Sequence, residues 1–190
     1  MLFRSVIMPV LHGFVQSGKT RVIGTSTWTA SRIKEANDFA NQNKLTRFTI
    51  NMQKWSYACP TPAMPADVNL EGDPVQYQKQ LELGLPLLAY SSQAKGFFFK
   101  AQKKGLTTEG LGSSAGFLCE ENIRRAQAVM ELARKDGISI AAASFAYLWS
   151  RKLPAAAMIG SKTMDELKDS LLDCDYKPGQ EAISLLEKAC

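Results

Sequence analysis

Apolar positions along this chain recur with two periods, which alternate from one end to the other. Apolar residues three or four positions apart predict helices over 6–17, 29–42, 120–136, 140–151 and 178–189. Short, nearly continuous apolar runs predict strands over 21–26, 48–55, 86–91 and 155–160. The pattern therefore predicts a single domain over 1–190, in which strands alternate with helices.

Polar residues mark where several helices begin. Asp73 precedes a proline at the first helical position and a glutamine three positions after the cap, which predicts a helix start. Ser139 is placed to cap the next-to-last long helix. Thr163 stands three positions before Glu166, which is the spacing of a capping box. These signals predict a helix after each of the second, third and fourth predicted strands.

Strands that are apolar on both faces indicate a parallel sheet covered by helices. Two architectures fit this order: an open doubly wound sheet and part of a (β/α)8 barrel. The first normally carries a glycine-rich phosphate loop after its first strand, whereas this chain has Gly24-Thr25-Ser26-Thr27-Trp28 there. The difference favours the barrel, whose active site lies at the C-terminal ends of its strands. A proline-rich loop is expected over 59–72 and an irregular glycine-rich stretch over 93–116.

Charge and composition narrow the classes of partner. The formal charge of +5 comes from dispersed pairs such as Lys103-Lys104 and Arg124-Arg125, which are typical of solvated helix faces, so nucleic-acid binding is not expected. The longest apolar run, 138–149, is too short to span a bilayer, and the first residues lack a signal-peptide pattern, so we expect a cytoplasmic protein without a membrane partner. Cysteines without zinc spacing and a single histidine predict no metal site.

Polar side chains collect at the ends of all four predicted strands. Hydroxyls, amides, one aromatic ring and one lysine suit a ligand that has an amide, a flat ring and phosphates, as a nicotinamide dinucleotide does. The helix start beside Lys162 offers unpaired N–H groups and a positive charge to a phosphate. In chain order these residues are Ser26, Thr27, Asn51, Gln53, Tyr90, Ser91, Ser92, Gln93, Ser161, Lys162 and Thr163.

Four segments resemble, in the correct order, the second half of bacterial NADP-dependent aldo-keto reductases. Residues 22–33 resemble the fifth strand and helix of that family, and Gln53-Lys54-Trp55-Ser56 resembles the sixth strand. Residues 88–98 resemble the seventh strand, and 159–167 resemble the eighth strand and the cofactor-phosphate helix. The resemblance implies an α/β fold, the C-terminal half (strands five to eight) of a (β/α)8 TIM barrel.

The same resemblance implies reduction of aldehydes and ketones with NADPH and assigns roles along the cofactor. Ser26 would hydrogen-bond the nicotinamide carboxamide, and Tyr90 would stack on the nicotinamide ring. The loop that carries Ser91, Gln93 and Lys95 would run along the pyrophosphate. Ser161, Lys162 and Thr163 would hold the 2′-phosphate of the adenosine ribose, and Glu166, Asp169 and Ser170 would lie near the adenine. Gly160 is a further expected cofactor-binding residue.

Two positions depart from the family pattern. The asparagine that binds the carboxamide in the family is Thr27 here, which lacks a side-chain amide. The family usually places a glutamine directly after the position of Asn51, whereas here Met52 stands in that place and Gln53 follows. Adjacent strand residues face opposite sides of a sheet, so the sequence leaves open whether Met52 or Gln53 faces the nicotinamide.

The half that carries the family's catalytic Asp, Tyr, Lys and His has no counterpart in these 190 residues. We therefore expect the cofactor-binding half of a carbonyl reductase, inactive as this chain alone. The alternative is a non-catalytic NADP-binding or interaction protein that retains the fold. Open edges at the first and last strands predict association, either with a second copy or with a missing N-terminal half.

Overall fold

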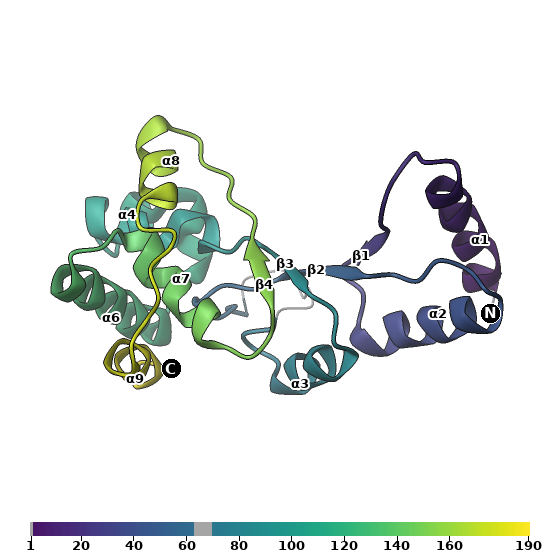
Figure 1. Cartoon of the computed structure of the whole chain (residues 1–190). Coiled ribbons are helices and arrows are strands. Elements are labelled where there is room, and N and C mark those ends of the chain that lie inside the picture. Colours follow the sequence, from purple (N-terminus) through teal and green to yellow (C-terminus); the bar gives the residue numbers. More distant parts are fainter. Residues whose placement is uncertain (1, 63–69) are drawn as a thin grey trace.

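A four-stranded parallel sheet forms the centre of the protein. The computed structural model describes residues 2–62 and 70–190. The strands follow chain order across the sheet, and within the described residues the outer two each pair on one side (Figure 1). Helical crossovers between parallel neighbours confirm the predicted α/β class. The strands are β1 (Gly24–Ser26), β2 (Ile50–Lys54), β3 (Leu87–Tyr90) and β4 (Ala155–Ala157), all shorter than predicted.

Helices connect the strands, and the predicted caps are present. Asp73 Oδ1 accepts the Gln76 N–H at 2.9 Å, and Ser139 Oγ accepts the Ala142 N–H at 3.1 Å. Helices α1 and α2 lie at the β1 end of the sheet, and most of the others gather at the β4 end (Figure 1). The helices are α1 (Leu2–Gln16), α2 (Ala30–Gln42), α3 (Pro74–Leu83), α4 (Phe97–Lys104), α5 (Thr108–Leu111), α6 (Glu120–Asp136), α7 (Ile140–Ser150), α8 (Met164–Leu171) and α9 (Gln180–Glu187).

The prediction of an irregular stretch over 93–116 is wrong. This segment contains α4 and α5, preceded by the 3-10 turn η1 (Ala94–Gly96) and followed by the 3-10 turn η2 (Gly112–Phe117). Buried aromatic side chains, including Phe97 and Phe98, hold α4 against the core. Gly96 is the N-cap of α4 and Gly105 is its C-cap, so these glycines bound the helix rather than interrupt it. Of the predicted loop over 59–72, residues 63–69 lie outside the described residues.

The two faces of the sheet differ, and Met52 and Gln53 of β2 lie on opposite faces. Asn51 and Gln53 pair in register with Leu87 and Ala89, which are buried in the main hydrophobic core under the helices. Asn51 Nδ2 donates to Gln80 Oε1 of α3 at 2.9 Å, and Gln53 Nε2 donates to the carbonyl of Trp28. Met52 therefore lies on the opposite face, where its register partners are Ser26 and Leu88.

A buried arginine joins α6 to the segments around the proline-rich loop. Arg125, which the sequence placed among solvated pairs, is only 3% exposed. Its guanidinium contacts Glu71 Oε1 at 2.6 Å and Glu121 Oε1 at 2.6 Å, and it donates to the carbonyl of Tyr57. The tertiary structure thus converts an apparent surface charge into an internal cross-link.

Candidate functional site

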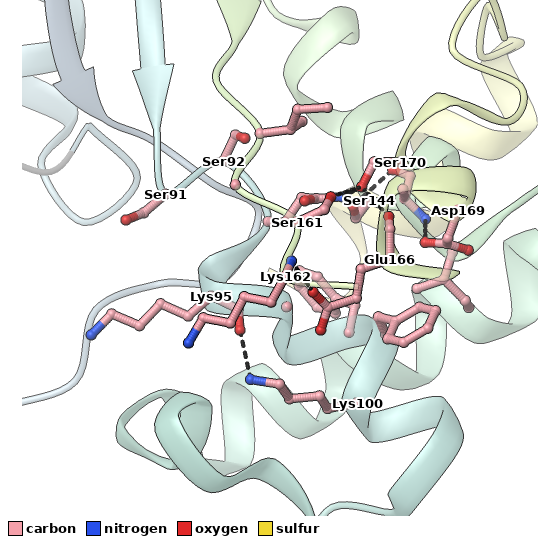
Figure 2. Close-up of a pocket in the computed structure, with 18 of the residues that line it drawn as sticks. Ser91, Ser92, Lys95, Lys100, Ser144, Ser161, Lys162, Glu166, Asp169 and Ser170 are labelled. Carbon is pink, nitrogen blue, oxygen red and sulfur yellow. Dashed lines mark hydrogen bonds between the residues drawn. The ribbon is translucent and has the colours of Figure 1, made fainter. Parts of the chain in front are cut away.

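A cavity of about 620 Å³ lies at the C-terminal ends of β3 and β4 (Figure 2). One wall is the segment that follows β3 and leads into α4. The opposite wall is the segment from Met158 through α8, and the start of α7 closes the back. Segments about seventy residues apart in sequence therefore meet here, at the end of the sheet where parallel α/β folds bind ligands.

Ten of the fourteen predicted cofactor residues line this cavity. The structure brings together the groups predicted after the third and fourth strands, whereas those predicted after the first two strands lie outside it. Thr163 stands at the border, as the cap of α8. The lining residues among the predicted set are Tyr90, Ser91, Gln93, Lys95, Gly160, Ser161, Lys162, Glu166, Asp169 and Ser170.

Hydroxyl and amide contacts fix the two walls to each other. Gln93 Nε2, after β3, donates to Ser170 Oγ of α8 at 2.8 Å, and Ser170 Oγ donates to the Glu166 carbonyl at 2.7 Å. Ser92 Oγ donates to the Met158 carbonyl at 2.8 Å. Direct hydrogen bonds therefore link the two walls of the cavity to each other.

The N-terminus of α8 is capped, but not in the predicted pattern. Thr163 Oγ1 accepts the Glu166 N–H at 3.2 Å, as expected. The Glu166 carboxylate, however, accepts the N–H of Lys162 at 2.7 Å, one residue before the cap. An anion that binds this helix start would meet the Lys162 ammonium and the Thr163 hydroxyl, and it would compete with the Glu166 carboxylate for the N–H.

Three lysines give the cavity a positive character. Lys95 and Lys162 extend side by side toward the same side of the cavity (Figure 2). Lys100, on the first turns of α4, points back to the segment after β3, and burial lowers the pKa of its ammonium. Sequence reasoning missed Lys100 because it took this stretch for a loop. The two glycines that bracket eight helix-forming residues were the signal that could have revealed it.

Asp169 serves the structure of the back wall. Its Oδ2 accepts the N–H of Ala141 at 3.2 Å, in the first turn of α7. Burial raises the pKa of Asp169, and the hydrogen bonds from the α7 backbone oppose this rise. The carboxylate therefore ties α8 to α7, and it lines the cavity with a side chain that already has a partner.

Ser26, Thr27 and Gln53 do not reach the cavity. Ser26 is the last residue of β1 and Thr27 follows it, and both are exposed. Thr27 adopts a left-handed backbone (φ 59°), and its hydroxyl donates to the Ser26 carbonyl at 2.7 Å. Gln53 is turned to the helix-covered face, so we leave it out of the proposed site. Met52, the register partner of Ser26, lies instead on the same face of the sheet as Ser26.

Comparison with known proteins finds one family. The sequence model described as "Aldo/keto reductase family" matches residues 5–189. The chain is 24% identical over 187 residues to the Saccharomyces cerevisiae protein named "Probable aryl-alcohol dehydrogenase AAD4", covering 95% of this chain and 54% of that protein. It is 26% identical over 185 residues to norsolorinic acid reductase stcV of Emericella nidulans, covering 95% and 43%.

A third relative is the versiconal hemiacetal acetate reductase of Aspergillus parasiticus, 27% identical over 193 residues, with 97% of this chain and 52% of that protein covered. The chain spans about half the length of the curated relatives it matches. These relatives are fungal, whereas the resemblance in sequence was to bacterial members. The structure also describes no helix that is long and apolar enough to cross a membrane.

Proposed function

Because the chain belongs to the aldo/keto reductase family, we propose that it is the NADP(H)-binding part of an oxidoreductase that reduces a carbonyl to an alcohol. In this proposal, β1 to β4 are strands five to eight of a (β/α)8 barrel. The observation that carries the proposal is the cavity at the ends of β3 and β4, where Lys95 and Lys162 extend in parallel beside the N-terminus of α8.

The residues of the cavity fit the phosphates of a dinucleotide. Lys162, Ser161 and Thr163 would hold the 2′-phosphate, because a lysine at a helix N-terminus adds a full charge to the partial charge of the N–H groups. Gly160 comes directly before these residues, and the space beside its Cα is open, because a Cβ there would meet nothing within 4 Å.

The remaining groups would orient the rest of the cofactor. Ser91, Gln93 and Lys95 would lie along the pyrophosphate, and Glu166, Asp169 and Ser170 would lie near the adenine. Tyr90 would stack on the nicotinamide, with Ser26 at its carboxamide. When bound, the nicotinamide supplies the hydride that the carbonyl carbon accepts, and the protein supplies position and charge.

A proton donor for the carbonyl oxygen has to come from elsewhere. We propose that these 190 residues alone are inactive and that a second four-stranded unit completes the barrel, either an N-terminal half or a second copy. Support comes from the outer strands, which pair on one side within the described residues, and from α1, where Val6, Val10 and Phe14 form an exposed apolar row.

The second candidate is a non-catalytic protein that binds NADP or a macromolecular partner. The nicotinamide end favours it, because Thr27 and Met52 stand where the family places an asparagine and a glutamine. An intact phosphate end with an altered nicotinamide end is compatible with binding that no longer supports hydride transfer.

Titration with NADPH and NADH, followed by nicotinamide fluorescence, tests the cofactor proposal. NADPH should bind at least about tenfold more tightly than NADH, because charge-assisted hydrogen bonds to the 2′-phosphate are worth about 1.5–3 kcal/mol at best. Lys162→Glu should erase the preference. Lys168→Glu makes the same charge change at an exposed position of α8 and should retain it. Equal binding of both cofactors by the unmutated chain would contradict the proposal.

Activity is tested separately, by NADPH oxidation with a panel of aldehydes and ketones. The 190-residue chain should give the rate of the buffer control. Addition of a separately expressed N-terminal half of a related reductase should restore turnover. Turnover by the chain alone that is lost when Tyr90 is replaced would overturn the claim of inactivity.

A further inference from the structure

Three consecutive residues on the wall of the cavity have a left-handed backbone. Ala94, Lys95 and Gly96 have φ values of 50°, 56° and 77° and form η1, directly after β3. Glycine adopts this conformation freely, but alanine and lysine pay a steric penalty there because their Cβ atoms approach the backbone oxygen. Such a turn persists only where its surroundings hold it in place.

Lys100 of α4 contacts this turn directly. Its ammonium donates to the Lys95 carbonyl at 2.9 Å, to Ser114 Oγ at 2.8 Å and to Ser113 Oγ at 3.2 Å. The hydroxyl of Ser114, which is fully buried, donates to the same Lys95 carbonyl at 2.6 Å. Two donors therefore converge on one carbonyl oxygen in the middle of the strained turn, and Figure 2 shows the Lys100 contact as a dashed line.

The three N–H donors of the Lys100 ammonium are matched by three protein acceptors. This is the arrangement of a structural clasp, because an ammonium committed in this way has no donor left for a ligand. Lys95 and Lys162, by contrast, extend their ammonium groups away from the wall (Figure 2). Lys100 thus hydrogen-bonds the protein itself, whereas the ammonium groups of Lys95 and Lys162 are placed to contact an anion.

The turn controls more than its own shape. It begins directly after Gln93, whose side chain bridges the cavity to Ser170 of α8. It also fixes the point from which the Lys95 side chain leaves the backbone. A change at Lys100 would therefore alter both the link between the walls and the position of a cation, although Lys100 itself is on α4.

We propose that Lys100 is a positioning residue: with Ser114 it clasps the Lys95 carbonyl, keeps residues 94–96 left-handed, and so presets the wall that carries Gln93 and Lys95. The ligand part of this inference rests on the proposed function, whereas the clasp itself does not.

Hydrogen exchange of individual amides, measured by NMR, tests the clasp without any ligand. The N–H groups of Gly96 and Phe97 donate to the Gln93 carbonyl and close the turn. In Lys100→Met these amides should exchange at least about tenfold faster, because charge-assisted hydrogen bonds to the turn are lost. Lys104→Met, one turn later and exposed, should leave them unchanged. Unchanged protection in Lys100→Met would overturn the proposal.

Two further variants separate a clasp from general damage to the fold. Lys100→Arg retains a cationic donor for the carbonyl and should restore most of the protection. Ser114→Ala removes the second donor and should accelerate the same amides, with an effect that is not additive to Lys100→Met since both act on one oxygen. Acceleration spread over α6 and α7 in all three variants would indicate global destabilisation and would refute a local role.

Cofactor binding then tests the functional part. Lys100→Met should weaken NADPH and NADH by the same factor, because the turn lies along the part of the dinucleotide that both share. Lys162→Met should weaken NADPH alone. A loss in Lys100→Met that is selective for NADPH, with unchanged amide protection, would show direct contact with the 2′-phosphate and overturn the positioning role. If neither dinucleotide binds the unmutated chain while the exchange results hold, the proposed function fails and the clasp stands.

Discussion

Removing the guanidinium of Arg125 should destabilise the chain far more than removing any surface charge. The Arg125–Glu71 contact is 2.6 Å long, and the two side chains are 4% and 6% exposed. Arg125→Met keeps much of the aliphatic stem but removes the cation that neutralises the buried Glu71 carboxylate, to which Tyr147 also hydrogen-bonds, and it removes a donor from the Tyr57 carbonyl. Breaking a buried pair in this way costs about 3–5 kcal/mol.

The chain contains a matched control for this prediction. Lys34 and Asp38 of α2 form an ion pair at 2.7 Å, nearly the same length, but their side chains are 70% and 50% exposed. Lys34→Met should cost about 0–1 kcal/mol, because water replaces the lost partner. The two variants therefore compare a buried and an exposed ion pair of nearly equal length.

Urea unfolding followed by circular dichroism measures both changes. The free energy of unfolding should fall by at least about 2 kcal/mol more for Arg125→Met than for Lys34→Met. The double variant Arg125→Met with Glu71→Gln should recover part of the loss, because it also removes the buried negative charge that Arg125 neutralised. Equal effects of the two single variants would refute the reasoning that burial, rather than distance, sets the energy of these pairs.

Three further predictions concern association, pH and thiol reactivity. Light scattering on a chromatographed sample should show species larger than 20.9 kDa, because within the described residues each outer strand pairs on one side only; a sharp, cooperatively melting monomer would contradict this. Burial raises the pKa of the Asp169 carboxyl above its ordinary 3.8. The contribution of this group to the free energy of unfolding is therefore full below pH 3.8, and it is lost as pH rises through the raised pKa. Asp169→Asn should therefore gain stability relative to the unmutated chain as pH rises above 3.8 in urea melts, and a constant difference would count against it. Burial raises the pKa of the Cys59 thiol to about 12, so iodoacetamide at pH 8 should label the exposed Cys174 and spare Cys59 until the chain unfolds.

Local signals in the sequence were sufficient for the class of fold and for most helix starts. Asp73, Ser139 and Thr163 cap the helices that they were predicted to cap, because an N-cap is a contact between residues two or three positions apart. The strand ends beside Tyr90 and Lys162 were predicted from the alternation of elements and from family resemblance. Both segments line the cavity because strands that are parallel end on the same side.

What the sequence left undecided depends on contacts between distant residues. The register with β3 places Gln53 on the helix-covered face of the sheet and Met52 on the other face. No local sequence pattern encodes a register. Arg125 looked like a surface charge until Glu71 and Tyr57, more than fifty residues away, enclosed it. Lys100 gained its role only because Ser114 and the Lys95 carbonyl meet it in space. Periodicity and caps were thus determined by neighbours along the chain, whereas burial, register and the clasp required the tertiary structure, because they are properties of pairs that the chain brings together only when folded.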